Sequence, residues 1–188
     1  MRANSSPFSS LPRQQANKGF TLIEVLIAFI ILTVGLLGTV ALQTNAKQAS
    51  YDANQRSAAL ALANDIMERI RANDTADIVA NYSKSFDYQD VLVEKKCLNI
   101  RCSSSDIAEY DVYQWQKALR VADNTGSLAN GTVCISPTAD DDGVRLRVVV
   151  AWQGRQRLTE STNETIACGN ITNRRTVVLD SYIFMRAA

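Results

Sequence analysis

The sequence has no histidine and only three prolines among its 188 residues. Histidine is the usual general acid or base near neutral pH and the commonest nitrogen ligand of zinc. Its absence therefore excludes the familiar serine and cysteine triads and disfavours a zinc site. The sequence also lacks a nucleophile motif and a phosphate-binding loop. We expect a protein that is not an enzyme and that uses no cofactor and no metal.

The chain lacks an excess of charge of either sign, because its 20 basic and 19 acidic residues give a formal net charge of +1. Binding of nucleic acid through bulk charge is therefore disfavoured. Hydrophobic residues make up 46% of the chain and charged residues 21%, which is typical of a globular protein and excludes a wholly disordered one. The length fits one domain with an appendage.

Residues 1–19 are typical of a targeting leader, because they contain three basic residues, no acidic residue and two of the three prolines. From Phe20 to Leu42 the sequence is apolar, and Glu24 is the only charged residue. As a helix this segment would be about 34 Å long, which is enough to cross a bilayer. The positive-inside rule puts the leader in the cytoplasm and the residues after Leu42 on the other side of the membrane.

The position of the apolar segment argues against an ordinary secretory signal, because Lys18 and Gly19 directly precede it. Cleavage after Gly19 would keep the helix in the mature protein. A carboxylate near the start of a membrane helix is costly unless it is paired, so Glu24 needs a partner. Cleavage would create an α-ammonium group on Phe20, and the same group of a neighbouring copy is a suitable partner that would fix the register between copies.

The run Lys18-Gly19-Phe20-Thr21-Leu22-Ile23-Glu24, followed by the apolar segment, resembles the class III signal of type IV pilins and of type II secretion pseudopilins. The resemblance implies cleavage after Gly19 by a prepilin peptidase and N-methylation of Phe20. It also implies that Glu24 helps to dock each subunit into a filament. The alternative is a signal anchor in which the glycine, the phenylalanine and the carboxylate coincide by chance.

Over residues 18–73 the sequence is similar to the PilV group of minor pilins, also called type IV pilus modification proteins. Beyond Asn73 the similarity is thin. It implies a minor pilin that helps initiate or cap the type IV pilus, with other minor pilins, the major pilin and the prepilin peptidase as partners. It further implies a single pass through the bacterial inner membrane with a periplasmic C-terminal domain, and then a place in the pilus at the cell surface.

Two other functions stay open from the sequence. A type II secretion pseudopilin would share all the N-terminal features. A tip pilin could instead bind DNA or a surface through its C-terminal part, because residues 143–188 carry seven arginines against three acidic residues. The candidate DNA contacts are Arg145, Arg147, Arg174 and Arg175. Residues 74–142 have the opposite balance, with twelve acidic and six basic residues, so pairing between neighbouring subunits explains the asymmetry equally well.

Because no proline occurs between Pro12 and Pro137, one helix can run from Phe20 to Asn73. We expect an α+β, pilin-like fold in which this helix packs on a small antiparallel sheet. The expected parts are a leader (1–19), a transmembrane half of the helix (20–42), an amphipathic half (43–73) and a periplasmic globular domain (74–188).

The amphipathic half of the helix has an apolar seam at three- and four-residue steps, with Arg56 as its one break. The seam consists of Ala46, Ala49, Ala53, Leu60, Ala63, Met67 and Ile70. A coiled-coil dimer is the alternative partner for this face. Gly35 and Gly38 in the apolar half indicate either close packing or a segment that loosens on assembly, and the sequence does not choose between these.

In the C-terminal part we expect a looped region over residues 74–107 and a short amphipathic helix from Asp111 to Val121. Strands are predicted over residues 132–136, 144–152 and 176–185, with a shorter one near residues 156–159. In the middle strand Leu146, Val148, Val150 and Trp152 share the face opposite Arg145 and Arg147.

All four cysteines lie in the part assigned to the oxidising periplasm, so disulfides are expected. Three pairings are possible, and we favour Cys97 with Cys102 and Cys134 with Cys168. The run Asp140-Asp141-Asp142-Gly143 could supply oxygen ligands to calcium, but it lacks the spaced ligands and the terminal glutamate of an EF-hand loop. An acidic hairpin turn is the favoured interpretation.

Overall fold

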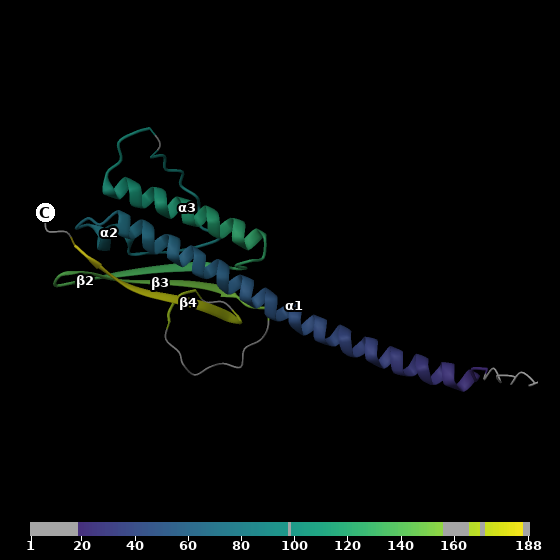
Figure 1. Cartoon of the computed structure of the whole chain (residues 1–188). Coiled ribbons are helices and arrows are strands. Elements are labelled where there is room, and N and C mark those ends of the chain that lie inside the picture. Colours follow the sequence, from purple (N-terminus) through teal and green to yellow (C-terminus); the bar gives the residue numbers. More distant parts are fainter. Residues whose placement is uncertain (1–18, 98, 156–165, 170–171, 186–188) are drawn as a thin grey trace, which may run out of the picture. The chain divides into compact units, whose positions relative to one another are not determined.

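The computed structural model describes residues 19–97, 99–155, 166–169 and 172–185. The chain divides into two compact units, residues 1–46 and 47–188. Within the described ranges the elements are α1 (Leu22–Ala72), α2 (Ile78–Tyr82), β1 (Lys84–Asp87), α3 (Ser104–Asn124), β2 (Thr132–Asp140), β3 (Gly143–Gln153) and β4 (Arg174–Phe184) (Figure 1). The α+β class is confirmed, and α1 agrees with the helix predicted over residues 20–73.

The sheet has the strand order β1-β2-β3-β4, and all neighbouring strands are antiparallel. Strands β2 and β3 form a hairpin in which Asp140 pairs with Gly143, so Asp141 and Asp142 make the predicted acidic turn. A Cβ atom at Gly143 would collide with the carbonyl of Ile183 on β4, which explains the glycine at this position. Strand β4 pairs with the whole length of β3.

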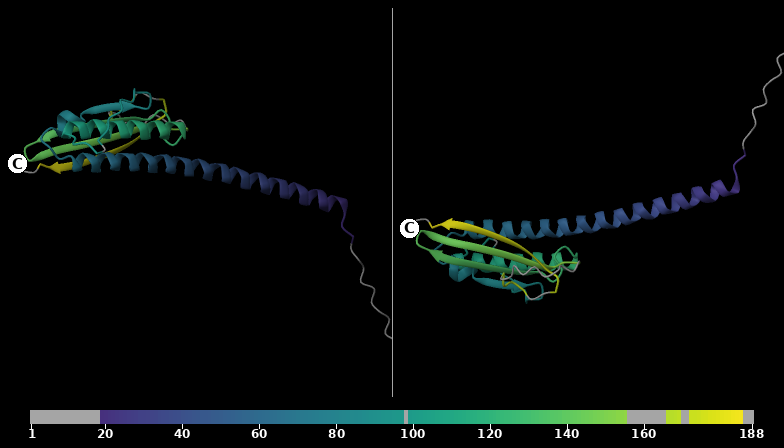
Figure 2. Two further views of the ribbon diagram at one scale, coloured as in Figure 1. Left: turned by 90° about the horizontal axis from the view of Figure 1, so that it is seen from above. Right: turned by 90° about the horizontal axis from the view of Figure 1, so that it is seen from below.

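One face of the sheet carries the main core of the second unit. The apolar face predicted for β3 is confirmed, since Leu146, Val148, Val150 and Trp152 are all buried. Helix α3 and the part of α1 after Lys47 both lie over this face (Figure 2). Trp115 and Leu119 of α3 belong to the same hydrophobic cluster. The core is therefore a layer of two helices on one layer of sheet.

The buried stripe of α1 differs from the predicted seam in its first half. The buried side chains are Gln55, Ala59, Ala63, Ile66, Met67 and Ile70, whereas Ala46, Ala49 and Ala53 are exposed. The stripe begins with a polar residue: Gln55 accepts a hydrogen bond from the Trp152 indole N–H (3.3 Å) and donates one to the Gly126 carbonyl (3.3 Å). The prediction was wrong for Ala46, Ala49 and Ala53, because burial of α1 begins only at Gln55, and it missed Gln55 because an apolar pattern does not include a glutamine.

The opposite face of the sheet exposes Arg145 and Arg147, as predicted, but Val149 and Ala151 on the same face are buried. They pack with Cys168, which a disulfide joins to Cys134 of β2. The second disulfide, Cys97–Cys102, lies just before α3. Both favoured pairings are confirmed, and the longer one ties the segment before β4 onto the sheet.

The prediction of a looped region over residues 74–107 is wrong in part, because it contains α2, β1 and the start of α3. Strand β1 is a short edge strand that buries Phe86 and pairs with β2. Helix α3 starts at Ser104 rather than Asp111. The Ser103 hydroxyl accepts a hydrogen bond from the Asp106 N–H (3.2 Å), while the Asp106 carboxylate accepts one from the Ser103 N–H (3.0 Å). This capping box fixes the start of the helix.

The predicted strands over residues 132–136, 144–152 and 176–185 correspond to β2, β3 and β4, and β2 extends further, to Asp140. The shorter strand predicted near residues 156–159 lies outside the described residues.

Candidate processing and docking site

The peptide bond predicted to be cleaved lies before the first turn of α1. Gly19, Phe20 and Thr21 are in neither a helix nor a strand. Phe20 is 80% exposed, and a Cβ atom built on Gly19 would meet no atom within 4 Å. A peptidase needs an accessible segment outside regular structure, and the Gly19–Phe20 bond meets this requirement.

Glu24 lies in the first turn of α1 and is exposed. The Thr21 carbonyl accepts hydrogen bonds from the N–H groups of Glu24 (3.1 Å) and Val25 (3.4 Å), so the helix begins directly after Thr21. A carboxylate in the first turn is stabilised by the helix dipole, and Thr21 and Glu24 have the spacing of a capping box. This glutamate therefore suits the start of its own helix, and its exposed carboxylate is accessible to a cation from outside the chain.

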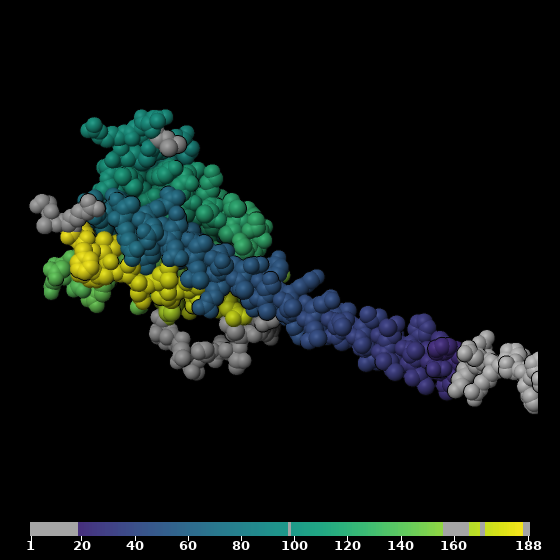
Figure 3. Space-filling model, viewed as in Figure 1, coloured from purple at the N-terminus to yellow at the C-terminus, as the bar shows by residue number. Residues whose placement is uncertain are grey.

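The apolar segment that follows is exposed along its whole length. Helix α1 contains an 18-residue window with a mean hydropathy of 2.7, and none of that window is buried. By length and composition α1 is the one described helix that could cross a membrane. The exposed side chains include Ile31, Leu37 and Leu42. Figure 3 shows the surface of this segment in purple and dark blue. An exposed apolar surface of this extent marks a membrane or protein contact.

The two glycines of the apolar segment have open surroundings. A Cβ atom at Gly35 or Gly38 would meet no atom within 4 Å. The packing of the chain on itself therefore does not require glycine at either position. Close packing in an assembly and loosening on assembly both stay open.

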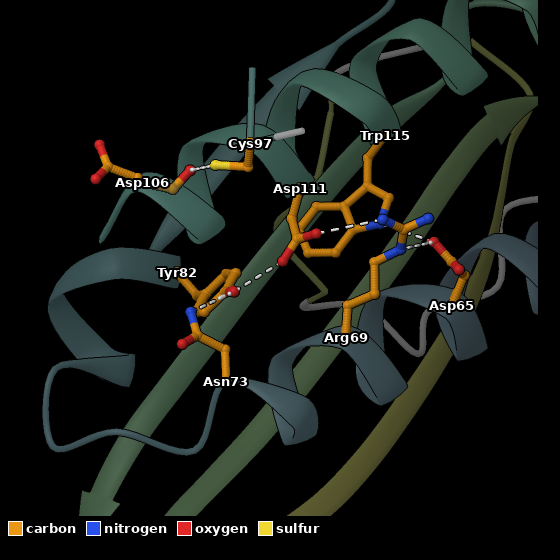
Figure 4. A network of polar contacts seen from close by, with 8 residues as sticks. All are labelled: Asp65, Arg69, Asn73, Tyr82, Cys97, Asp106, Asp111 and Trp115. Atoms are coloured by element: carbon orange, nitrogen blue, oxygen red, sulfur yellow. Dashed lines mark hydrogen bonds and ion pairs between the residues drawn. The ribbon is translucent and has the colours of Figure 1, made fainter. Parts of the chain in front are cut away.

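The sequence analysis missed a partly buried polar network that joins α1, α2 and α3 (Figure 4). Asp111 of α3 accepts hydrogen bonds from the Tyr82 hydroxyl (2.9 Å) and the Arg69 guanidinium (3.3 Å). The side-chain amide of Asn73 donates to the Tyr82 oxygen and to the Ser104 carbonyl, both at 2.9 Å. The end of α1 is thereby connected to α2 and to the first turn of α3.

A second carboxylate completes the network on α1. Asp65 accepts hydrogen bonds from Arg69 Nε and from the Trp115 indole N–H, both at 2.9 Å. Burial raises the pKa of Asp111, although the hydrogen bonds from Tyr82 and Arg69 oppose the shift. Burial also raises the pKa of the Tyr82 hydroxyl. We assign the network a structural role, which is to hold three helices in one arrangement.

A signal for this network was present in the sequence. Ala108, Asp111, Trp115 and Leu119 follow one another at three- and four-residue steps, and all four are buried in α3. A carboxylate within an apolar stripe predicts a buried partner, because a buried charge is stable only when it is paired and hydrogen-bonded.

Arg145 and Arg147, two of the candidate DNA contacts, lie on the exposed face of β3, where each pairs with a carboxylate. Arg145 Nε lies 3.1 Å from Asp140, and Arg147 makes two hydrogen bonds to Asp180, at 2.7 and 3.1 Å. These pairs offset the positive charge of this face.

Arg174 and Arg175 are neighbours on β4 and therefore point to opposite faces of the sheet. Arg174 donates to the carbonyls of Cys168 (3.0 Å) and Gly169 (3.2 Å). Arg175 is opposite Trp152 on the face covered by the helices, and its Nη2 lies 3.8 Å from Asp52. The structure therefore does not bring the four candidate arginines together in one patch.

No cluster of three or more acidic, cysteine or histidine side chains suited to a metal ion occurs within the described ranges. The acidic residues at 140–142 form the hairpin turn.

Two family models match adjacent parts of the chain. The model of the prokaryotic N-terminal methylation motif matches residues 14–40, and that of type IV pilin Tt1218 matches residues 41–113. No curated protein and no solved structure matches the chain. The methylation motif implies processing by a prepilin peptidase and assembly with other pilins, which are structural subunits rather than enzymes. The two matches support the type IV pilin superfamily, as a pilin of a pilus or pseudopilus system.

Proposed function

We propose that the chain is a minor pilin of the PilV group that helps initiate or cap assembly of the type IV pilus. It docks with other minor pilins and with the major pilin through its N-terminal helix. One observation carries this proposal: an exposed Gly19–Phe20 bond precedes α1, and α1 has an accessible carboxylate in its first turn and an exposed apolar first half. The similarity of residues 18–73 to PilV supports a minor pilin.

In this proposal, residues 1–19 are a cytoplasmic leader that the prepilin peptidase removes, and residues 20–42 cross the bacterial inner membrane once. Residues 43–73 continue the helix into the periplasm, where residues 74–188 form the globular domain. The disulfides Cys97–Cys102 and Cys134–Cys168 suit that oxidising compartment. During assembly, Glu24 pairs with the methylated α-ammonium group of Phe20 on a neighbouring subunit, which offsets the cost of a carboxylate in an apolar surrounding.

The test is to quantify the chain in sheared surface filaments and in the membrane fraction, beside the most abundant pilin. We expect trace amounts of the wild-type protein in filaments. Glu24→Gln should lower its incorporation strongly, whereas Glu68→Gln, a control on the exposed side of the same helix, should not. Normal incorporation of Glu24→Gln would contradict the docking role.

The same experiment separates the nearest alternative. A type II secretion pseudopilin would be processed in the same way but would stay in the membrane fraction and be absent from pili. Finding the processed chain only in the membrane of piliated cells would therefore favour a pseudopilin.

A DNA-binding tip pilin is the weaker alternative, because Arg145 and Arg147 are paired with carboxylates and Arg175 lies on the other face. It would show salt-dependent retention on DNA that is lost when Arg145 and Arg147 are neutralised.

A further inference from the structure

The two ends of the sheet in the second unit differ in the charged side chains that they expose. At one end lies the acidic turn, which we define as Asp140, Asp141 and Asp142. All three residues are exposed. Asp140 pairs with Arg145, whereas Asp141 and Asp142 form no ion pair with another described residue. The acidic turn therefore presents two carboxylates to the surroundings.

At the other end of the sheet, β3 ends at Gln153 and β4 begins at Arg174 (Figure 1), and basic side chains line the corner between these strand ends and α1. We define the basic end as the four cations Lys47, Arg56, Arg155 and Arg175 at this corner. Two hollows meet at Asp52. One, of about 290 Å³, is lined by Arg56, Trp152 and Arg175, and the other, of about 520 Å³, by Lys47, Tyr51 and Arg155.

The cations of the basic end are incompletely paired within the described ranges. Lys47 and Arg56 form no ion pair there, and Arg155 stacks on the Tyr51 ring at 3.9 Å without one. Arg175 has only Asp52, at 3.8 Å, and its buried Nε has no hydrogen-bond partner. Among the described residues, Arg175 is thus the one cation of the basic end with a carboxylate partner. Arginine binds carboxylates through charge-assisted and often bidentate hydrogen bonds, so this end suits an acidic protein segment.

We propose that the acidic turn of one copy of this chain docks into the basic end of a second copy. Both halves of the contact are present on one chain, which is why a second copy is the occupant that the charges favour. The eleven residues of β3 separate the two ends by about 36 Å at about 3.3 Å per residue. A contact between different ends of identical molecules is heterologous, so it does not close into a symmetric dimer. This inference rests on the proposed function and assigns it a subunit contact outside α1.

The test uses two differently tagged full-length copies in the same membrane, with a photo-crosslinking residue in place of the exposed Ala139 beside the acidic turn of one copy. Wild-type copies should crosslink, and the product should map to residues 47–56 of the other copy. Reversing the turn (Asp141→Lys with Asp142→Lys) or the basic end (Lys47→Glu with Arg56→Glu) should each lower the yield by about tenfold through like-charge repulsion.

Combining the two reversed copies, with the reversed turn on one and the reversed basic end on the other, should restore the yield to within about twofold of the wild type. Restoration also shows that neither variant is misfolded. The matched control, Lys84→Glu with Lys117→Glu, reverses two exposed cations outside the basic end and should leave the yield unchanged.

Three outcomes would overturn the proposal: no crosslink between wild-type copies, no restoration in the combined variant, or a crosslink that maps only to another pilin. A fourth outcome would overturn it in favour of a lipid surface as the occupant. In that case the protein would bind phosphatidylglycerol vesicles and be released by Lys47→Glu with Arg56→Glu, while Asp141→Lys with Asp142→Lys would not change the crosslink yield. Copies that crosslink in cells whose filaments lack the chain would contradict the proposed function and leave this contact standing. Filaments that contain the chain without any such crosslink would support the proposed function and contradict this contact.

Discussion

The two halves of α1 belong to one helix but have opposite surroundings. From Leu22 to Leu42 every side chain is exposed, and the apolar residues surround the axis. From Gln55 to Ile70 only one stripe is apolar, and that stripe is buried in the core of the second unit. The second half is stabilised by the chain itself, because burying an apolar side chain contributes about 1.5–3 kcal/mol. The first half must obtain the same stabilisation from a membrane or from other subunits.

The two halves of α1 also differ in the surroundings of their small residues. Ala59 and Ala63 lie in the buried stripe and belong to the main hydrophobic cluster. In the first half, a Cβ atom at Gly35 or Gly38 would meet no atom within 4 Å. The packing of the chain on itself therefore does not explain these two glycines.

The largest expected effect is the loss of cleavage before the first half of α1, which would keep this half from joining its partners. We expect Gly19→Leu to abolish processing, so that essentially all of the protein keeps residues 1–19. The fold should not change, because a side chain at this position meets no atom within 4 Å. The intact mass of membrane-extracted protein measures the result. Gly35→Leu, a control with equally open surroundings, should be processed normally, and normal processing of Gly19→Leu would contradict the assigned cleavage site.

The next prediction compares the same substitution in the two halves. Ile66 is fully buried and Ile30 is 62% exposed. Ile66→Ala should lower the free energy of unfolding by about 2–5 kcal/mol through lost burial and the cavity left behind. Ile30→Ala should change it by less than about 0.5 kcal/mol. Denaturant titration of the full chain in detergent, followed by near-ultraviolet circular dichroism, measures both, and equal effects would show that the two halves do not differ as described.

A smaller effect compares the two disulfides of the second unit. Cys134–Cys168 closes a sequence separation of 34 residues and Cys97–Cys102 one of 5. By the loop-entropy model, replacing the first pair with alanine should lower the free energy of unfolding by about 3–4 kcal/mol and replacing the second by about 2 kcal/mol. The same titration under oxidising conditions measures the difference. A larger loss of unfolding free energy on removing Cys97–Cys102 would mean that this disulfide stabilises structure beyond the loop that it closes.

The smallest effect is a change in pH dependence at Asp111. Burial raises the pKa of this carboxyl above its ordinary value of 3.8, so its contribution to stability is fully present below that value and is lost as pH rises through the raised pKa. Asp111→Asn should therefore flatten the fall in stability just above pH 3.8.

The pH dependence expected from Asp106 is the reverse, because the hydrogen bonds from Lys95 and Ser103 hold its pKa far below the usual range. Its contribution is present at neutral pH and lost on acidification, so Asp106→Asn should flatten the acid limb. Thermal unfolding as a function of pH distinguishes the two variants, and parallel profiles would contradict both assignments.

The parts of the fold that the sequence predicts are those in which local pattern and tertiary environment agree. The absence of proline and the long apolar run predict α1, and runs of β-branched residues predict the three long strands. Strand β1 escapes prediction because it has one buried residue, Phe86, and exists as a strand through its pairing with β2. The start of α3 was predictable in principle, since Ser103 and Asp106 have capping-box spacing.

The functional residues also divide into those that a local pattern predicts and those that only tertiary contacts bring together. Gly19, Phe20 and Glu24 are recognisable because a local motif carries them, and the structure shows that they are accessible. The network around Asp111 depends on residues from three helices, and no local pattern brings Tyr82 and Arg69 to one carboxylate. The basic end likewise forms only when Arg175 of β4 meets Asp52 of α1.

The most direct test of the account is the mass of the N-terminal peptide of this chain in purified filaments. The account predicts a peptide that begins at Phe20 and carries one N-methyl group, because the exposed bond after Gly19 is cut before the helix joins its neighbours. A peptide that still contains residues from the leader, in protein assembled into filaments, would contradict it.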